Sequence, residues 1–121
     1  MKPLEFVKEM ITSPDTQVSA KWKEKCIATD TEEKAVELLI EIMLVYGRDV
    51  SDFVQNMCEF ILSQHYGNQI LEQEVVRDVQ GNWLYPVAVT QVHAVGNKYL
   101  YEELERRKAA VRSQNSNIEA A

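Results

Sequence analysis

Two histidines and two cysteines offer the most versatile chemistry in this sequence, namely Cys26, Cys58, His65 and His93. Together they could supply the four ligands of a zinc ion. Structural zinc sites draw their ligands in close pairs such as C-x-x-C, and none of these four residues lies within a few positions of another. The spacing therefore predicts no metal site. We expect the cysteines to be buried, free thiols of a cytoplasmic protein.

Catalytic motifs are equally scarce. No serine stands in a G-x-S-x-G setting, and neither a G-x-G-x-x-G nor a P-loop pattern is present. His93 could form a small polar site with Asp78, Tyr85 or Tyr99, although a solvent-facing strand histidine is the simpler interpretation. We therefore expect a protein that is not an enzyme and uses no cofactor. A small enzyme or ligand-binding protein with a site near His93 is kept as an alternative.

Acidic side chains are concentrated in the middle of the chain. The sequence has 13 Lys+Arg against 19 Asp+Glu, a net charge of −6, and residues 29–64 carry an acidic excess of the same size. This balance argues against nucleic-acid binding, which needs clustered cations. Glu33, Glu37 and Glu41 recur at four-residue spacing on one helical face. We expect this acidic strip to contact a partner protein with a basic surface.

The residues before position 70 have helical patterns. Helices are predicted over residues 3–12, 14–28 and 51–66, and from Asp30 to a stop at Gly47. The helix between Asp30 and Gly47 is apolar around most of its circumference, so we expect it to be central. Gly67 is predicted to end the helix that begins at Ser51.

The pattern then changes to one that favours strands. Residues 74–85 predict a β-hairpin that turns at Gln80-Gly81-Asn82. The β-branched residues of 87–95 favour a strand, although Ala88, Val92 and Val95 also fit helical spacing. Gly96-Asn97 is predicted to break the chain before a last helix over residues 98–112.

The last predicted helix has a narrow apolar stripe, formed by Leu100, Leu104 and Val111. Such a stripe docks a helix only marginally, so we expect a second surface on it to be covered. Tyr99, Tyr101 and Arg106 are the residues expected to contact another copy or a partner. On this interpretation, truncation after Gly96 leaves the first four helices folded.

These patterns predict one mainly helical α+β domain over residues 1–112, followed by a polar tail over 113–121. A bundle of about four helices precedes a β-hairpin or small antiparallel sheet and a C-terminal helix; an all-α fold is the alternative. The longest apolar run, Ile42–Tyr46, is too short to span a membrane.

The function expected from these features is protein binding through the acidic helical surface, as an inhibitor, adaptor or assembly factor, of a kind that a phage could encode. A subunit of a homo-oligomeric structural assembly is the alternative, because an acidic middle and a basic end permit self-association.

Overall fold

The computed structural model describes residues 1–16, 18–45, 50–74, 79–80 and 89–120. Their helices are α1 (Pro3–Thr12), a 3-10 turn (Pro14–Thr16), α2 (Ala20–Ile27), α3 (Glu32–Leu44), α4 (Asp52–Glu74) and α5 (Val89–Ala120). The described residues form no strand, and a single antiparallel bridge joins Val18 to Val50. The α+β prediction is therefore wrong, and the all-α alternative is correct.

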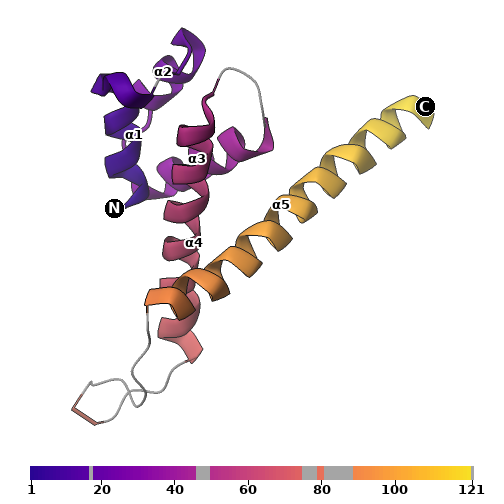
Figure 1. Ribbon diagram of the computed structural model, residues 1–121. Coiled ribbons are helices and arrows are strands. Elements are labelled where there is room, and N and C mark those ends of the chain that lie inside the picture. The colour runs from indigo at the N-terminus through magenta and orange to yellow at the C-terminus, as the bar shows by residue number, and fades with distance from the viewer. Residues whose placement is uncertain (17, 46–49, 75–78, 81–88, 121) are drawn as a thin grey trace.

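The helices divide into a compact body, formed by α1 to α4 and the first part of α5, and a long arm, formed by the rest of α5. α1, α2 and α3 gather around the first half of α4, while α5 crosses the second half of α4 and then runs away from the other helices (Figure 1). α3 contacts each of the other four α-helices, so the prediction of a central helix is confirmed. No α-helix in the described part of the chain is long and apolar enough to cross a lipid bilayer.

One apolar core joins all five helices. Its largest fully buried side chains include Phe6, Met10, Trp22, Leu39, Ile61 and Leu100. Cys26 and Cys58 are free thiols within it. Burial raises the pKa of the Cys26 thiol to about 11 and also raises the pKa of Cys58, since the thiolate form would lose its hydration.

Local capping residues set the helix starts, and α2 and α3 begin later in the sequence than predicted. α1 has the expected bounds, whereas α2 begins only at Ala20 because the 3-10 turn precedes it. α3 is capped by Thr31, whose Oγ1 accepts a hydrogen bond from the Lys34 N–H at 3.2 Å. Ser51 is the expected cap of α4, since its Oγ accepts from the Val54 N–H at 3.3 Å.

Gly67 is predicted to end a helix and Gly96 to break the chain before one, but both glycines lie inside helices. α4 continues through Gly67, and α5 continues through Gly96. A Cβ on Gly67 would sit 2.0 Å from the carbonyl oxygen of Val92, and a Cβ on Gly96 would sit 1.7 Å from that of Ser63. The glycines therefore allow the two helix backbones to touch where α4 and α5 cross.

One predicted strand is helical where the structure describes it, and most of the predicted hairpin lies outside the described residues. Residues 75–78 and 81–85 of the expected hairpin lie outside the described residues, while Glu74 belongs to α4. The strand expected over 87–95 is wrong from Val89 onward, where the chain is helical. Helical spacing places Val92, Gly96 and Leu100 on the side that meets α4, and this packing outweighs the strand preference of β-branched residues.

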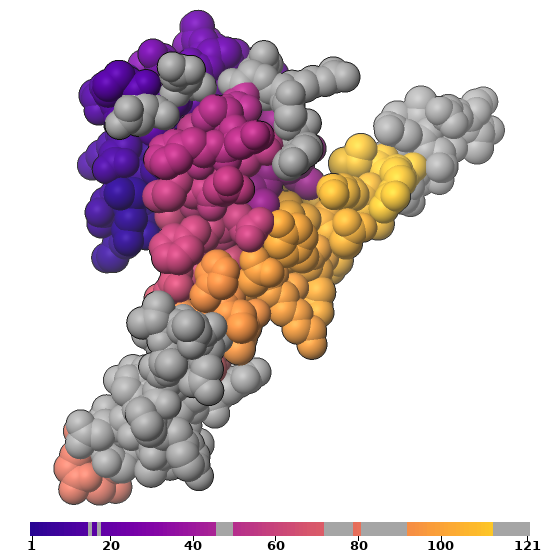
Figure 2. Space-filling view, in the orientation of Figure 1, coloured from indigo at the N-terminus to yellow at the C-terminus, as the bar shows by residue number. Residues whose placement is uncertain are grey.

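The docking of α5 also differs from the prediction. Leu100 and Leu104 are 0% and 4% exposed, so this part of the helix belongs to the core rather than to its periphery. Val111, the third residue of the predicted stripe, is 55% exposed. In Figure 2 the coloured part of α5 runs from orange beside the magenta atoms of α4 to yellow at its outer end. The expected polar tail continues α5 as far as Ala120.

Candidate functional site

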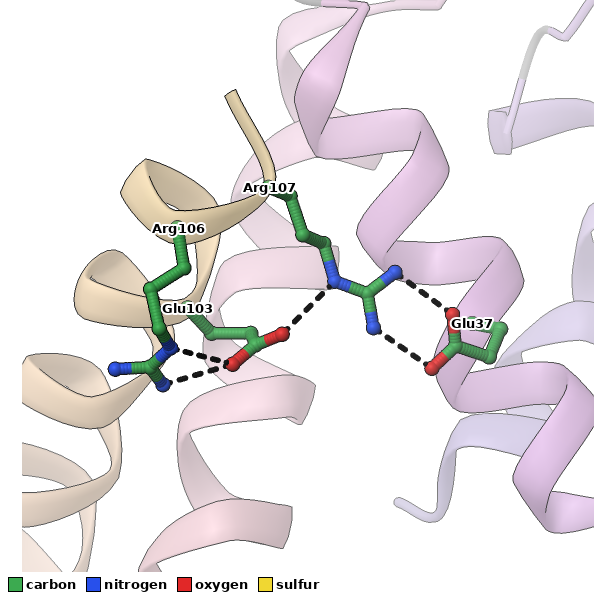
Figure 3. A network of polar contacts seen from close by, with 4 residues as sticks. All are labelled: Glu37, Glu103, Arg106 and Arg107. Carbon is green, nitrogen blue, oxygen red and sulfur yellow. Dashed lines mark hydrogen bonds and ion pairs between the residues drawn. The ribbon is translucent and has the colours of Figure 1, made fainter. Parts of the chain in front are cut away.

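An ion-pair network joins α3 to α5 and contains two of the residues predicted from the sequence (Figure 3). Arg107 donates from Nη1 and Nη2 to the two carboxylate oxygens of Glu37, at 2.8 and 2.9 Å. The Nε of Arg107 donates to Glu103 at 3.0 Å. The second oxygen of Glu103 accepts from Nε and Nη2 of Arg106, at 3.0 and 2.7 Å. Arg107 is therefore shared between carboxylates of two helices.

The pKa shifts of this network follow its geometry. Hydrogen bonds from Arg107 lower the pKa of Glu37, and hydrogen bonds from Arg106 are the main reason that the pKa of Glu103 is lowered. The hydrogen bonds of Arg107 to Glu37 and Glu103 raise the pKa of Arg107. All four side chains stay ionised at neutral pH, so the network offers paired charges and no group poised for proton transfer.

Two tyrosines extend the network toward α4. The guanidinium of Arg106 lies 5.5 Å from the ring centre of Tyr99, and Tyr99 lies 4.9 Å from the ring centre of Tyr66. Burial raises the pKa of Tyr66 to about 12. The structure thus brings Glu37, Arg106 and Tyr99 together, as residues of one polar and aromatic cluster.

Tyr101 lies apart from this cluster. Its hydroxyl donates to a carboxylate oxygen of Glu59 on α4. Beside it, the Asn97 amide donates to Ser63 at 3.2 Å and to Glu59 at 3.4 Å. These contacts fasten α5 to α4, although the Tyr101 side chain remains half-exposed.

The remaining predicted glutamates line a hollow between α2 and α3, which we call the acidic groove. It has a volume of about 570 Å³, and its charged lining residues are Lys25, Glu33, Lys34, Glu37 and Glu41. Glu41 is paired with Lys25, and Glu37 is held by Arg107. Glu33 is exposed and has no ion-pair partner among the described residues.

A second hollow lies where α5 leaves the body, and we call it the basic groove. Its volume is about 370 Å³, and it is lined by Leu44, Arg107, Lys108, Val111 and Arg112. Lys108 is 3.6 Å from Glu105, and Arg112 has no ion-pair partner in the described part of the chain. The two grooves meet at the bond between Glu37 and Arg107.

The cysteines and histidines do not form a shared centre. Across the described residues, no three His, Cys, Asp or Glu side chains could hold a metal ion. His93 stacks on Phe60 with ring centres 5.5 Å apart, whereas Tyr99 contacts Tyr66 instead. Asp78 and Tyr85, the other residues considered near His93, lie outside the described residues.

Arg107 is the residue that sequence reasoning missed. Its spacing from Glu103 predicts an intrahelical pair, but its bond to Glu37 joins residues 70 positions apart. Comparison with known proteins adds no relative, because no family model, curated protein or solved structure matches this chain.

Proposed function

We propose that this chain is a subunit of a homo-oligomer, assembled by contact between the acidic groove of one copy and the basic groove of another. The observation that carries the proposal is the adjacency of the two grooves at the Glu37–Arg107 bond. Because the surfaces have opposite charge and adjoin, one patch can complement itself across a twofold axis.

Two unpaired charges support the proposed contact. Glu33 in the acidic groove and Arg112 in the basic groove are exposed, and neither has an ion-pair partner among the described residues. A twofold pairing places Arg112 of each copy against Glu33 of the other, so the same ion pair forms twice. Leu44 and Val111, which also line the basic groove, would add apolar contact area.

The length of α5 supports the same arrangement. The helix has 32 residues, a length of about 48 Å, and among its side chains up to Arg112 Leu104 is the last that is buried. A helical segment without tertiary packing is only marginally stable in water. A second copy would give the exposed turns around Val111 the packing that their own body does not supply.

A docking strip for a basic foreign protein has less support. Two of its three glutamates, Glu37 and Glu41, already bind cations of their own chain, which leaves Glu33. We place the assembly in the cytoplasm, because both cysteines are free thiols.

Charge reversal in one chain tests the proposal by analytical ultracentrifugation. We expect Glu33→Lys and Arg112→Glu each to raise the dissociation constant about tenfold or more, since each change breaks the pair twice. The double variant E33K/R112E restores the attraction with its sign inverted, and it should recover most of the affinity.

Glu5→Lys is the matched control, because Glu5 is also exposed but lies on α1, outside both grooves. It changes the net charge as Glu33→Lys does and should leave association intact. A wild-type chain that sediments as a monomer at every concentration would contradict the proposal. So would a double variant that is weaker than either single variant.

A further inference from the structure

A third hollow lies between the starts of α1 and α3 and the middle of α4, and it shares no lining residue with the two grooves. Its volume is about 560 Å³, and it is more enclosed than either groove. Its polar and aromatic lining includes Lys2, Glu32, Phe60, Gln64, His65 and Asn68. This volume lies within the range of small-molecule sites, and the lining combines one aromatic ring with several polar groups.

Three carboxamides lie along the α4 side of this cavity. Gln64, Asn68 and Gln69 all line it, and each amide offers a donor next to an acceptor. The Nε2 atom of Gln64 is buried and has no hydrogen-bond partner within the described part of the chain. A buried donor without a partner is costly, so a rotation of the Gln64 side chain that brings this amide to an acceptor on a ligand in the cavity would be favoured.

Phe60 gives the cavity a stacking surface. Its side chain is half-exposed, although the residue is large and apolar. His93 lies on the ring with an interplanar angle of 29°, so Phe60 is already part of a stack of flat groups. A planar ligand could extend that stack, as nucleobases do on aromatic side chains.

His65 and Glu32 complete the polar lining. Burial lowers the pKa of His65, so its imidazole is neutral at neutral pH. Its Nε2 lies 3.3 Å from the Gln69 amide nitrogen; when that amide donates, Nδ1 carries the imidazole proton. One oxygen of Glu32 accepts the Leu4 N–H at 3.2 Å, which leaves its other oxygen for a ligand hydroxyl.

We propose that this cavity binds a purine nucleoside, with adenosine as the preferred ligand. The base stacks on Phe60, the carboxamides of α4 bind its edge, and Glu32 accepts from a ribose hydroxyl. Asparagine and glutamine amides match the N6 and N7 pair of adenine, which selects this base. The acidic net charge of −6 favours a free nucleoside over a nucleic-acid strand.

Calorimetric titration of the full chain with adenosine tests the site. We expect saturable binding with a dissociation constant below about 1 mM. Inosine has a carbonyl in place of the adenine amino group, and we expect it to bind at least about fivefold more weakly. Equal binding of adenosine, inosine and benzyl alcohol would reveal only an unspecific apolar hollow and would overturn the proposal.

Two variants assign the binding to this cavity. Phe60→Leu removes the stacking ring and should weaken adenosine binding about tenfold or more. Phe53→Leu is its matched control, because Phe53 is also half-exposed on α4 but does not line the cavity. Equal effects of the two changes would contradict the assignment.

Gln64→Leu removes the unpartnered amide and keeps the side-chain volume. It should reduce the preference for adenosine over inosine even if Phe60→Leu fails to fold. The Glu33→Lys variant should bind adenosine normally, which keeps this test separate from the test of self-association. Absence of any adenosine binding at about 1 mM would overturn the inference.

Discussion

Arg107 links α5 to α3 by an ion pair. Its guanidinium binds both oxygens of Glu37 in a fork geometry, and a lysine in its place could not reproduce this contact. The Glu103–Arg107 pair could be predicted from its spacing, because residues four apart on a helix are neighbours. The Glu37 contact could not, since only the packed helices bring these two residues together.

Replacing Glu37 with glutamine should make the free energy of unfolding depend less on pH in the acidic range. The folded-state pKa of Glu37 is lowered, so its stabilising contribution is present above the ordinary glutamate pKa of about 4.3 and is lost as pH falls through the folded value. At neutral pH the half-exposed pair contributes about 0.2–1 kcal/mol. Urea unfolding of wild type and Glu37→Gln across a pH series measures the difference.

Lys34 and Asp30 provide the comparison for that experiment. They also form an ion pair, but both side chains are largely exposed and lie four residues apart near the start of α3. Asp30→Asn should therefore change neutral-pH stability by less than Glu37→Gln does. A constant stability difference between wild type and Glu37→Gln at every pH would contradict the assigned role of Glu37.

At the scale of elements, the sequence predicts those features that depend on neighbouring residues. The bounds of α1, the Ser51 cap and the central position of α3 follow from proline placement, capping chemistry and apolar periodicity. The full lengths of α4 and α5 do not. Their glycines have the local pattern of helix stops, and only the crossing of the two helices explains their place inside helices.

Gly67→Ala should destabilise the protein, despite the higher helix propensity of alanine. The added methyl would meet the Val92 carbonyl, which is backbone and cannot rotate away, so α4 and α5 would have to separate. We expect a loss of about 1–3 kcal/mol in the free energy of unfolding, measured by urea denaturation.

Asn56→Ala is a suitable control for the glycine substitution, because Asn56 is exposed on the same helix. It should be neutral or slightly stabilising, since alanine favours helices. A Gly67→Ala protein that is as stable as this control would show that the helices do not approach as closely as described.

At the scale of the whole molecule, the part of α5 around Leu100 and Leu104 is packed in the core, and the part around Val111 is exposed. Truncation after Gly96 would remove Leu100 and Leu104, so we now expect it to unfold the chain rather than to leave a stable four-helix body. Truncation after Lys108 retains both leucines and Arg107 but removes Val111 and Arg112. This shorter chain should melt cooperatively, as followed by circular dichroism, and should sediment as a monomer.

Because both cysteines are buried, chemical labelling of their thiols can report when the core opens. Cys26 belongs to α2 and Cys58 to α4, and a thiol-modifying reagent can reach either one only after local or global unfolding. The order of modification, followed by mass spectrometry of intact chains, would then report the order of opening. Early labelling of Cys26 would mean that α2 detaches while the first half of α4 stays packed. Simultaneous labelling would mean that α2 and α4 lose their packing in a single cooperative event.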